Sequence, residues 1–388
     1  MAGSSLIAPG GKWDDAHLDA FRLIGDPPAD QVMQAIVGEG RNELAQATAY
    51  LGMLVDSGSP PNNPHPALEA FLAETYELPD WADPELIARG HACFKDWGPQ
   101  IILSLFCASL PSAYAAKKGV QVLAHTARLD TDTKRRIMET GQFLVDVLQP
   151  GGLDHDGVGR RSIQRVRLMH ATVRALVQLR ASQDPTTWHD DWGVPINQED
   201  LAGTLQSFAF VVGEPLPKLG IRVARRDANA YIHLWNVIGH QLGLHRELQP
   251  ADLGQAGQLV DQIRRRQQAA SPEGREMGEA LVAFLEAQIP GRFADDYIAT
   301  LIRYLVGAEV GEMIGVPAGA RLPTIVERLL ALLTGSRKDL SGGRSWLQHL
   351  SEPVGRELVS AAFGVERFGS RQPFALPSGL ADHWKLPD

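Results

Sequence analysis

Apolar residues recur at helical spacing along almost the whole chain, and this pattern limits the fold to helices. Amphipathic stretches alternate with short clusters of Pro and Gly, and no segment shows the sustained two-residue alternation of a half-buried strand. The sequence therefore predicts an all-α fold. The expected helices run roughly over residues 30–56, 66–77, 84–108, 112–127, 131–149, 161–182, 198–212, 227–243, 251–268, 272–288, 293–313, 322–334 and 344–365.

The connections between these helices give no sign that the chain is divided into separate domains. They are too short and too varied in composition to be clear interdomain linkers, and no internal repeat is present. The glycine-rich segment 150–160 follows a helix rather than a strand, so it is expected to be a flexible connector and not a phosphate loop. Asn197, three residues before Asp200, marks a helix start. Residues 1–388 are predicted to form one all-α domain.

Composition and charge exclude some classes of function. The net charge of -9, with no basic cluster to offset it, argues against a nucleic-acid partner. The longest apolar run, 101–110, is too short to span a bilayer. No secretion signal is visible, so a cytoplasmic location is expected, or a secreted one if the sequence is a trimmed mature form. Cys93 and Cys107 lie on apolar segments and are expected to be buried thiols. A monomer or a simple homo-oligomer is expected.

His170 is the residue that most directly suggests a chemistry. It lies at the edge of an apolar helical stripe that includes Val166, Met169 and Val173. A neutral imidazole is a good iron ligand, and such a stripe would shield a haem from water. Arg174 follows one turn later, where its guanidinium could pair with a haem propionate. The same pattern also fits a satisfied core histidine, which is the commoner case.

A second helix carries a polar group of residues on an otherwise apolar face. Arg136, Thr140, Phe143 and Val147 repeat at helical spacing, and Glu139 lies next to this face. If this helix faces His170 across a haem, it provides a hydrogen-bond donor, a hydroxyl and a titratable acid in an apolar wall. The alternative is that Arg136 forms an ordinary salt bridge between helices.

The blocks around these residues resemble one known family. They are Arg136-Ile-Met-Glu-Thr140, Phe143-Leu-Val-Asp-Val-Leu-Gln-Pro-Gly-Gly152, Val166-Arg-Leu-Met-His-Ala-Thr-Val-Arg174, Ile196-Asn-Gln-Glu-Asp-Leu201 and Trp235-Asn-Val-Ile-Gly-His-Gln-Leu-Gly243. In this order and spacing they resemble the latex-clearing proteins, or rubber oxygenases, and the wider MpaB-like oxygenases. The resemblance covers a core of about residues 100–245.

The resemblance implies an all-α fold with a globin-like core that holds haem b, and additional flanking helices. It implies His170 as the proximal iron ligand. Arg136 and Thr140 match residues on the oxygen-binding side, with Phe143 in the haem wall, and Arg174 matches an arginine on the ligand helix. His240 falls in a similar block without an assigned role.

Two departures from the family pattern concern the acid–base groups. Rubber oxygenases carry a lysine three positions after the distal arginine, where this chain has Glu139. They also use an upstream glutamate as base, whereas residues 112–128 contain no Asp or Glu here. Glu139 is therefore the expected proton-transfer group.

These features predict a haem b-dependent oxygenase that uses O2 on a small or polymeric hydrophobic, unsaturated substrate, with oxidative C=C cleavage as the family's best-known reaction. Arg136, Glu139 and Thr140 would be its catalytic residues. A peroxidase or peroxygenase is the first alternative, because acid–base groups near iron also serve O–O cleavage. A non-catalytic haem or O2-binding protein is the second.

Overall fold

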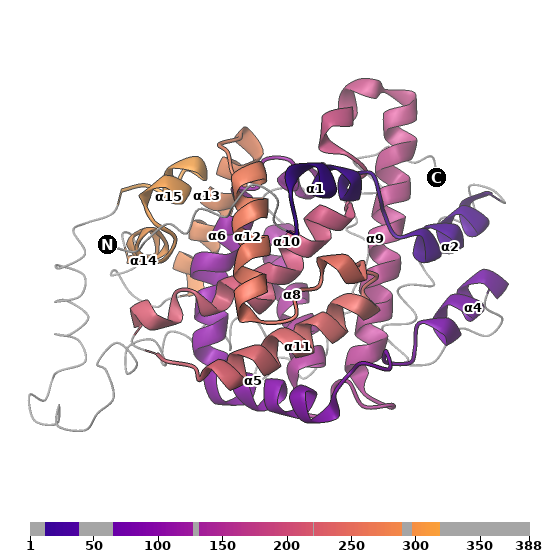
Figure 1. Cartoon of the computed structure of the whole chain (residues 1–388). Helices are drawn as coiled ribbons and strands as arrows, with labels where there is room; N and C mark the ends of the chain where they lie inside the picture. Colours follow the sequence, from indigo (N-terminus) through magenta and orange to yellow (C-terminus); the bar gives the residue numbers. More distant parts are fainter. Residues whose placement is uncertain (1–11, 39–64, 127–131, 220, 289–296, 319–388) are drawn as a thin grey trace, which may run out of the picture.

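The computed structural model describes residues 12–38, 65–126, 132–219, 221–288 and 297–318 (Figure 1). These ranges are dominated by helices and contain no strand, only one isolated bridge between Ala116 and Gln268, so the all-α prediction is confirmed. None of their helices has both the length and the apolar character needed to cross a bilayer. The α-helices are α1 (Asp15–Arg22), α2 (Pro27–Gly38), α4 (Pro66–Glu74), α5 (Pro84–Ser104), α6 (Leu110–Tyr114), α7 (Val120–Thr126), α8 (Asp132–Leu148), α9 (Val158–Gln183), α10 (Gln198–Ala209), α11 (Arg225–Gln241), α12 (Leu253–Gln267), α13 (Pro272–Gln288), α14 (Tyr297–Val306) and α15 (Ala308–Met313).

The pairing of α5 with α11 forms the centre of the main hydrophobic core. The two helices run side by side (Figure 1), and Leu234 and Trp235 of α11 are completely buried. A Cβ atom at Gly90 would lie only 2.8 Å from Cβ of Leu234, so glycine allows the two helices to approach this closely. Phe208 of α10 stacks on Trp235 with 5.2 Å between ring centroids. This contact joins α10 to the same core.

The helix predicted over 84–108 ends differently in the structure. The α-helical hydrogen bonding of α5 stops at Ser104, and a π-helical turn over 105–109 leads into α6. Two causes are visible. Pro111 has no amide hydrogen for the preceding turn, and the Ser104 hydroxyl donates to the carbonyl oxygen of Val212 at 2.6 Å. The helix predicted over 112–127 is likewise divided, into α6 and α7.

Other helix boundaries follow from individual residues. Asn197 accepts a hydrogen bond from the backbone N–H of Asp200 at 2.9 Å, which confirms the predicted start of α10. Gly307 adopts a φ of +91° and separates α14 from α15, so the single helix predicted over 293–313 is wrong. The predicted helices 322–334 and 344–365, and the part of helix 30–56 after residue 38, lie outside the described residues.

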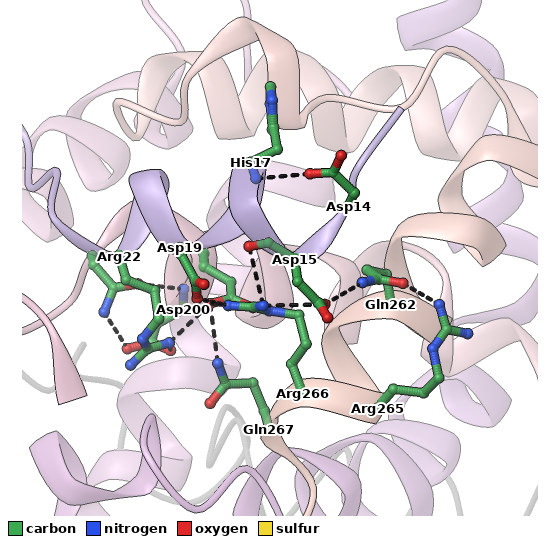
Figure 2. Close-up of polar contacts among 12 residues, drawn as sticks. Asp14, Asp15, His17, Asp19, Arg22, Asp200, Gln262, Arg265, Arg266 and Gln267 are labelled. Atoms are coloured by element: carbon green, nitrogen blue, oxygen red, sulfur yellow. Dashed lines mark hydrogen bonds and ion pairs between the residues drawn. The ribbon is translucent and has the colours of Figure 1, made fainter. Parts of the chain in front are cut away.

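Helix α1 was not anticipated from the sequence. Asp14 caps its start by accepting from the backbone N–H of His17 at 2.8 Å. The helix is attached to α10 and α12 by charged groups (Figure 2). Arg22 binds Glu199 and Asp200 at 3.1 and 2.9 Å. Because α1 is only 8 residues long, these tertiary contacts, and not its own propensity, account for its formation.

The two cysteines are reduced and buried, as predicted. Burial raises the pKa of both Cys93 and Cys107 to about 12. At pH 8 only about one thiol in ten thousand would be a thiolate, and the thiolate is the reactive form. We expect Ellman's reagent to leave both thiols unmodified in the native protein and to titrate both after unfolding in guanidinium chloride. Fast reaction of either thiol in the native protein would contradict this burial.

Candidate functional site

His170 lies near the middle of α9, a helix of 26 residues. Its side chain is half-buried. Val173 and Val177, one and two turns further along the same side of α9, are buried against Val122 and Trp188. The predicted apolar stripe beside the histidine is therefore present in the fold.

The environment of His170 keeps its imidazole uncharged. Burial lowers the pKa of His170 to about 4, the charge of Arg174 acts in the same direction, and Asp26 opposes it. Within the described ranges the imidazole makes no hydrogen bond to another residue. A neutral ring with a nitrogen lone pair that protein donors do not use has the properties of a haem ligand. The residues present thus fit this group.

Helix α8 carries the other residues that the sequence singled out. Glu139 and Thr140 are both half-buried. Thr140 lines a cavity of about 260 Å³. Phe143 is buried in the main core, one turn beyond Thr140. Arg136 lies on the first half of α8, and its side chain is outside the part of the chain that the structure describes.

A glycine-rich turn joins α8 to α9 and fixes the two helices as a hairpin. A Cβ atom on Gly152 or Gly157 would come within 2.3 Å of a backbone oxygen, of Asp146 and Gly152 respectively. The N–H of Gly159 donates to the carbonyl oxygen of Gly152 at 2.9 Å. The expectation of a flexible connector is wrong, because these contacts pack the turn against itself. This close packing fixes α8, which carries Glu139, relative to α9, which carries His170.

Arg174 is held by protein groups. Its Nε donates to the carbonyl oxygen of Pro195 at 2.9 Å, its Nη2 donates to that of Ile196 at 3.0 Å, and its Nη1 pairs with Asp30. The side chain is 3% exposed. The sequence predicted that Arg174 would pair with a haem propionate. In the structure its guanidinium instead connects α9 to α2 and to the segment before α10.

A second arginine on α9 repeats this arrangement and was missed from the sequence. Arg167 binds both carboxylate oxygens of Asp26, at 2.6 and 2.8 Å. Arg167 and Arg174 are seven residues apart, so they lie on one side of α9 with His170 between them. Their partners are Asp26, immediately before α2, and Asp30, the fourth residue of α2. One signal of these pairs is present in the sequence, which is that the arginines stand among apolar positions. A buried arginine requires a partner, so such a position indicates an ion pair.

His240 also has structural neighbours. It lies at the end of α11, and its ring meets the edge of Trp81 with 5.7 Å between centroids. Burial lowers the pKa of His240, and the charges of Arg167 and Arg246 act in the same direction. The side chain is half-buried among aromatic and cationic side chains.

Comparison with known proteins gives three matches. Residues 97–335 match the family described as ER-bound oxygenase mpaB/B′/rubber oxygenase, catalytic domain. A rubber oxygenase of Streptomyces sp. (strain K30) is 29% identical over 316 residues, which cover 79% of this chain and 74% of that protein. A solved structure of latex clearing protein in the closed state is similar with a TM-score of 0.71 and 25% identity, over 92% of this chain and 95% of that one. The family match includes all of α8 and α9.

Proposed function

The chain belongs to the family of MpaB-type and rubber oxygenases and is therefore an oxidoreductase, and from this premise we propose that it is a haem b-dependent oxygenase of a hydrophobic, unsaturated substrate. The observation that carries the proposal is the state of His170. The histidine is neutral at physiological pH, half-buried, and without a hydrogen bond to another described residue. Its helix is held on one side by two arginine–aspartate pairs, in both of which the arginine is largely buried.

The roles of the chain's own residues follow from their positions. A bound haem would supply the iron that activates dioxygen. His170 would hold it through a ring nitrogen, and Val173 and Phe143 would exclude water from the surroundings. Thr140 would offer a hydroxyl donor from α8, and Arg136, on the same helix, would supply a cation. Glu139 would accept a proton from the substrate, or return one, at its carboxylate.

The reaction that best fits is the cleavage of a C=C bond. One dioxygen adds across the double bond, the bond between the two carbons breaks, and each carbon ends as a carbonyl carrying one oxygen atom. The Streptomyces relative is called a rubber oxygenase, which supports a hydrophobic and even a polymeric substrate. The half-buried carboxylate of Glu139 keeps peroxide chemistry as a second possibility, because such a group also assists O–O cleavage.

The first experiment is an absorption spectrum of the purified protein with a pyridine haemochrome assay. We expect about one b-type haem per chain. Oxygen uptake with a panel of unsaturated lipids and terpenoids then tests catalysis, and dependence on added hydrogen peroxide separates the peroxygenase alternative. If no haem binds even after reconstitution with hemin, the proposal fails. Haem without turnover of any substrate would favour a carrier.

Glu139→Gln tests the proton-transfer role. The amide is nearly isosteric and cannot accept a proton near neutral pH, so we expect haem to be retained and turnover to fall on the order of 10²–10⁴-fold. Glu69→Gln on α4, at an exposed position, is the matched control and should leave both unchanged. Turnover is measured by oxygen uptake at saturating substrate. An unchanged rate in Glu139→Gln would remove Glu139 from the mechanism.

A further inference from the structure

A cavity of about 260 Å³ lies beside the candidate site, between α6, α7, α10, α12 and α13, and Thr140 of α8 forms part of its wall. Much of its surface is apolar. The apolar lining includes Phe106, Leu110, Val120, Leu123, Ile263 and Met277. At about 30 Å³ for each water-sized group, the volume accommodates on the order of ten non-hydrogen atoms. The size suits a small hydrocarbon skeleton, which would lie in contact with Thr140.

The polar part of the lining comes mainly from α10 and α12. It contains Glu199, Asp200 and Gln267. Glu199 is completely buried and is bound by Arg22 and Arg266, at 3.1 and 2.8 Å. Asp200 is also bound by Arg22, at 2.9 Å. Both carboxylates already have cations, so a cationic ligand would lose its hydration without gaining a free partner, and an anionic ligand would be repelled.

One polar atom in this wall has no partner. Gln267 is 4% exposed, and its Nε2 donates to Glu199 at 3.0 Å, whereas its Oε1 is buried without any hydrogen bond. In Figure 2 the amide oxygen of Gln267 points away from the ion network. A buried carbonyl oxygen without a donor costs free energy, and a neutral ligand with one N–H or O–H group could satisfy it.

We propose that this cavity binds a small unsaturated alcohol, whose hydroxyl donates to Oε1 of Gln267 while its hydrocarbon body lies against the apolar wall. The substrate class of the proposed oxygenase would then be short alkenols. The binding of the alcohol is inferred from the cavity alone, and only its role as the substrate rests on the proposed function. The connection is Thr140, which belongs to the cavity wall and to α8 of the candidate site.

Binding of geraniol to the full-length protein tests the assignment. The comparison ligand is the analogue in which the hydroxymethyl group is replaced by a methyl group, so that the two differ only in the hydroxyl. Titration calorimetry should give about tenfold or greater tighter binding for geraniol, because a site built around a hydrogen bond discriminates against a ligand that lacks it. Equal affinity for the two ligands would overturn the proposal.

Two variants locate the binding in this cavity. Gln267→Leu should weaken geraniol binding about tenfold and leave the hydrocarbon analogue unaffected. Gln262→Leu, the same change on α12 at a residue that contacts Asp15 and does not line the cavity, should leave both affinities unchanged. If Gln267→Leu fails to fold, Ala113→Phe provides a second test, since Ala113 lines the cavity and a phenyl ring would fill it. Unaltered geraniol binding in the folded variants would overturn the assignment.

Failure of the alcohol-binding proposal and failure of the proposed oxygenase function would give different results. Tight geraniol binding that depends on Gln267, in a protein that takes up no haem and consumes no oxygen, would support the cavity and refute the oxygenase mechanism. Oxygen uptake with a hydrocarbon polymer, in a protein that does not bind geraniol, would support the mechanism and refute the alcohol as substrate.

Discussion

His170→Ala is expected to abolish haem binding while the helical circular dichroism is largely retained. The imidazole is the only described group on this side of α9 that the structure presents as a neutral iron ligand, and alanine cannot replace it. The fold should survive because the half-buried ring makes no hydrogen bond with other described residues. Haem content is measured by the pyridine haemochrome assay after reconstitution with hemin.

Two controls make this result specific. His240→Ala removes a half-buried histidine that packs on Trp81, and it should keep haem at the wild-type level. Added imidazole should restore part of the haem binding of His170→Ala, because the free ligand can occupy the space left by the side chain. Full haem occupancy in His170→Ala without imidazole would disprove the ligand assignment.

The sequence was sufficient for the parts of the fold that depend on local pattern. Helices α8 to α13 lie within a few residues of their predicted positions, because each carries its own apolar face. The π-helical turn over 105–109 and the missed helix α1 show the limit. Apart from the local effect of Pro111 on the turn, both depend on contacts with distant residues, such as the bond from Ser104 to Val212 and the pairing of Arg22 with Glu199. No local periodicity records such contacts.

The candidate site, too, could be predicted from the sequence only in its local features. His170 and the α8 residues Glu139 and Thr140 could be proposed from spacing and resemblance, since they lie within two neighbouring helices. The partner of Arg174 could not, because Asp30 is 144 residues away in the chain. Spacing alone suggested a propionate, and only the fold shows that α2 brings a carboxylate to this arginine. The cavity beside Thr140 could not be predicted from the sequence, because residues of six helices that lie far apart in the chain form its walls.

Substitution of a residue in the buried ion network around α1 is expected to lower the stability of the protein strongly. Arg22 is 4% exposed and bonds two carboxylates, of which Glu199 is completely buried. Its Nη2 also donates to the carbonyl oxygen of Trp192. Removing one member of a buried network is costly because the remaining charges stay out of water without compensation. Burial raises the pKa of Asp200, and the charge of Arg22 acts against this increase.

We therefore expect Arg22→Met to lower the free energy of unfolding by about 3–5 kcal/mol, a large share of the total for a globular protein. Urea unfolding followed by circular dichroism measures the change. Arg89→Met is the control, because Arg89 pairs with Asp227 at 3.1 Å near the surface and should cost about 1 kcal/mol or less. Adding Asp200→Asn to Arg22→Met should recover part of the loss, since it removes a carboxylate left without its arginine. Equal effects of the two arginine substitutions would show that the network does not hold α1 in place.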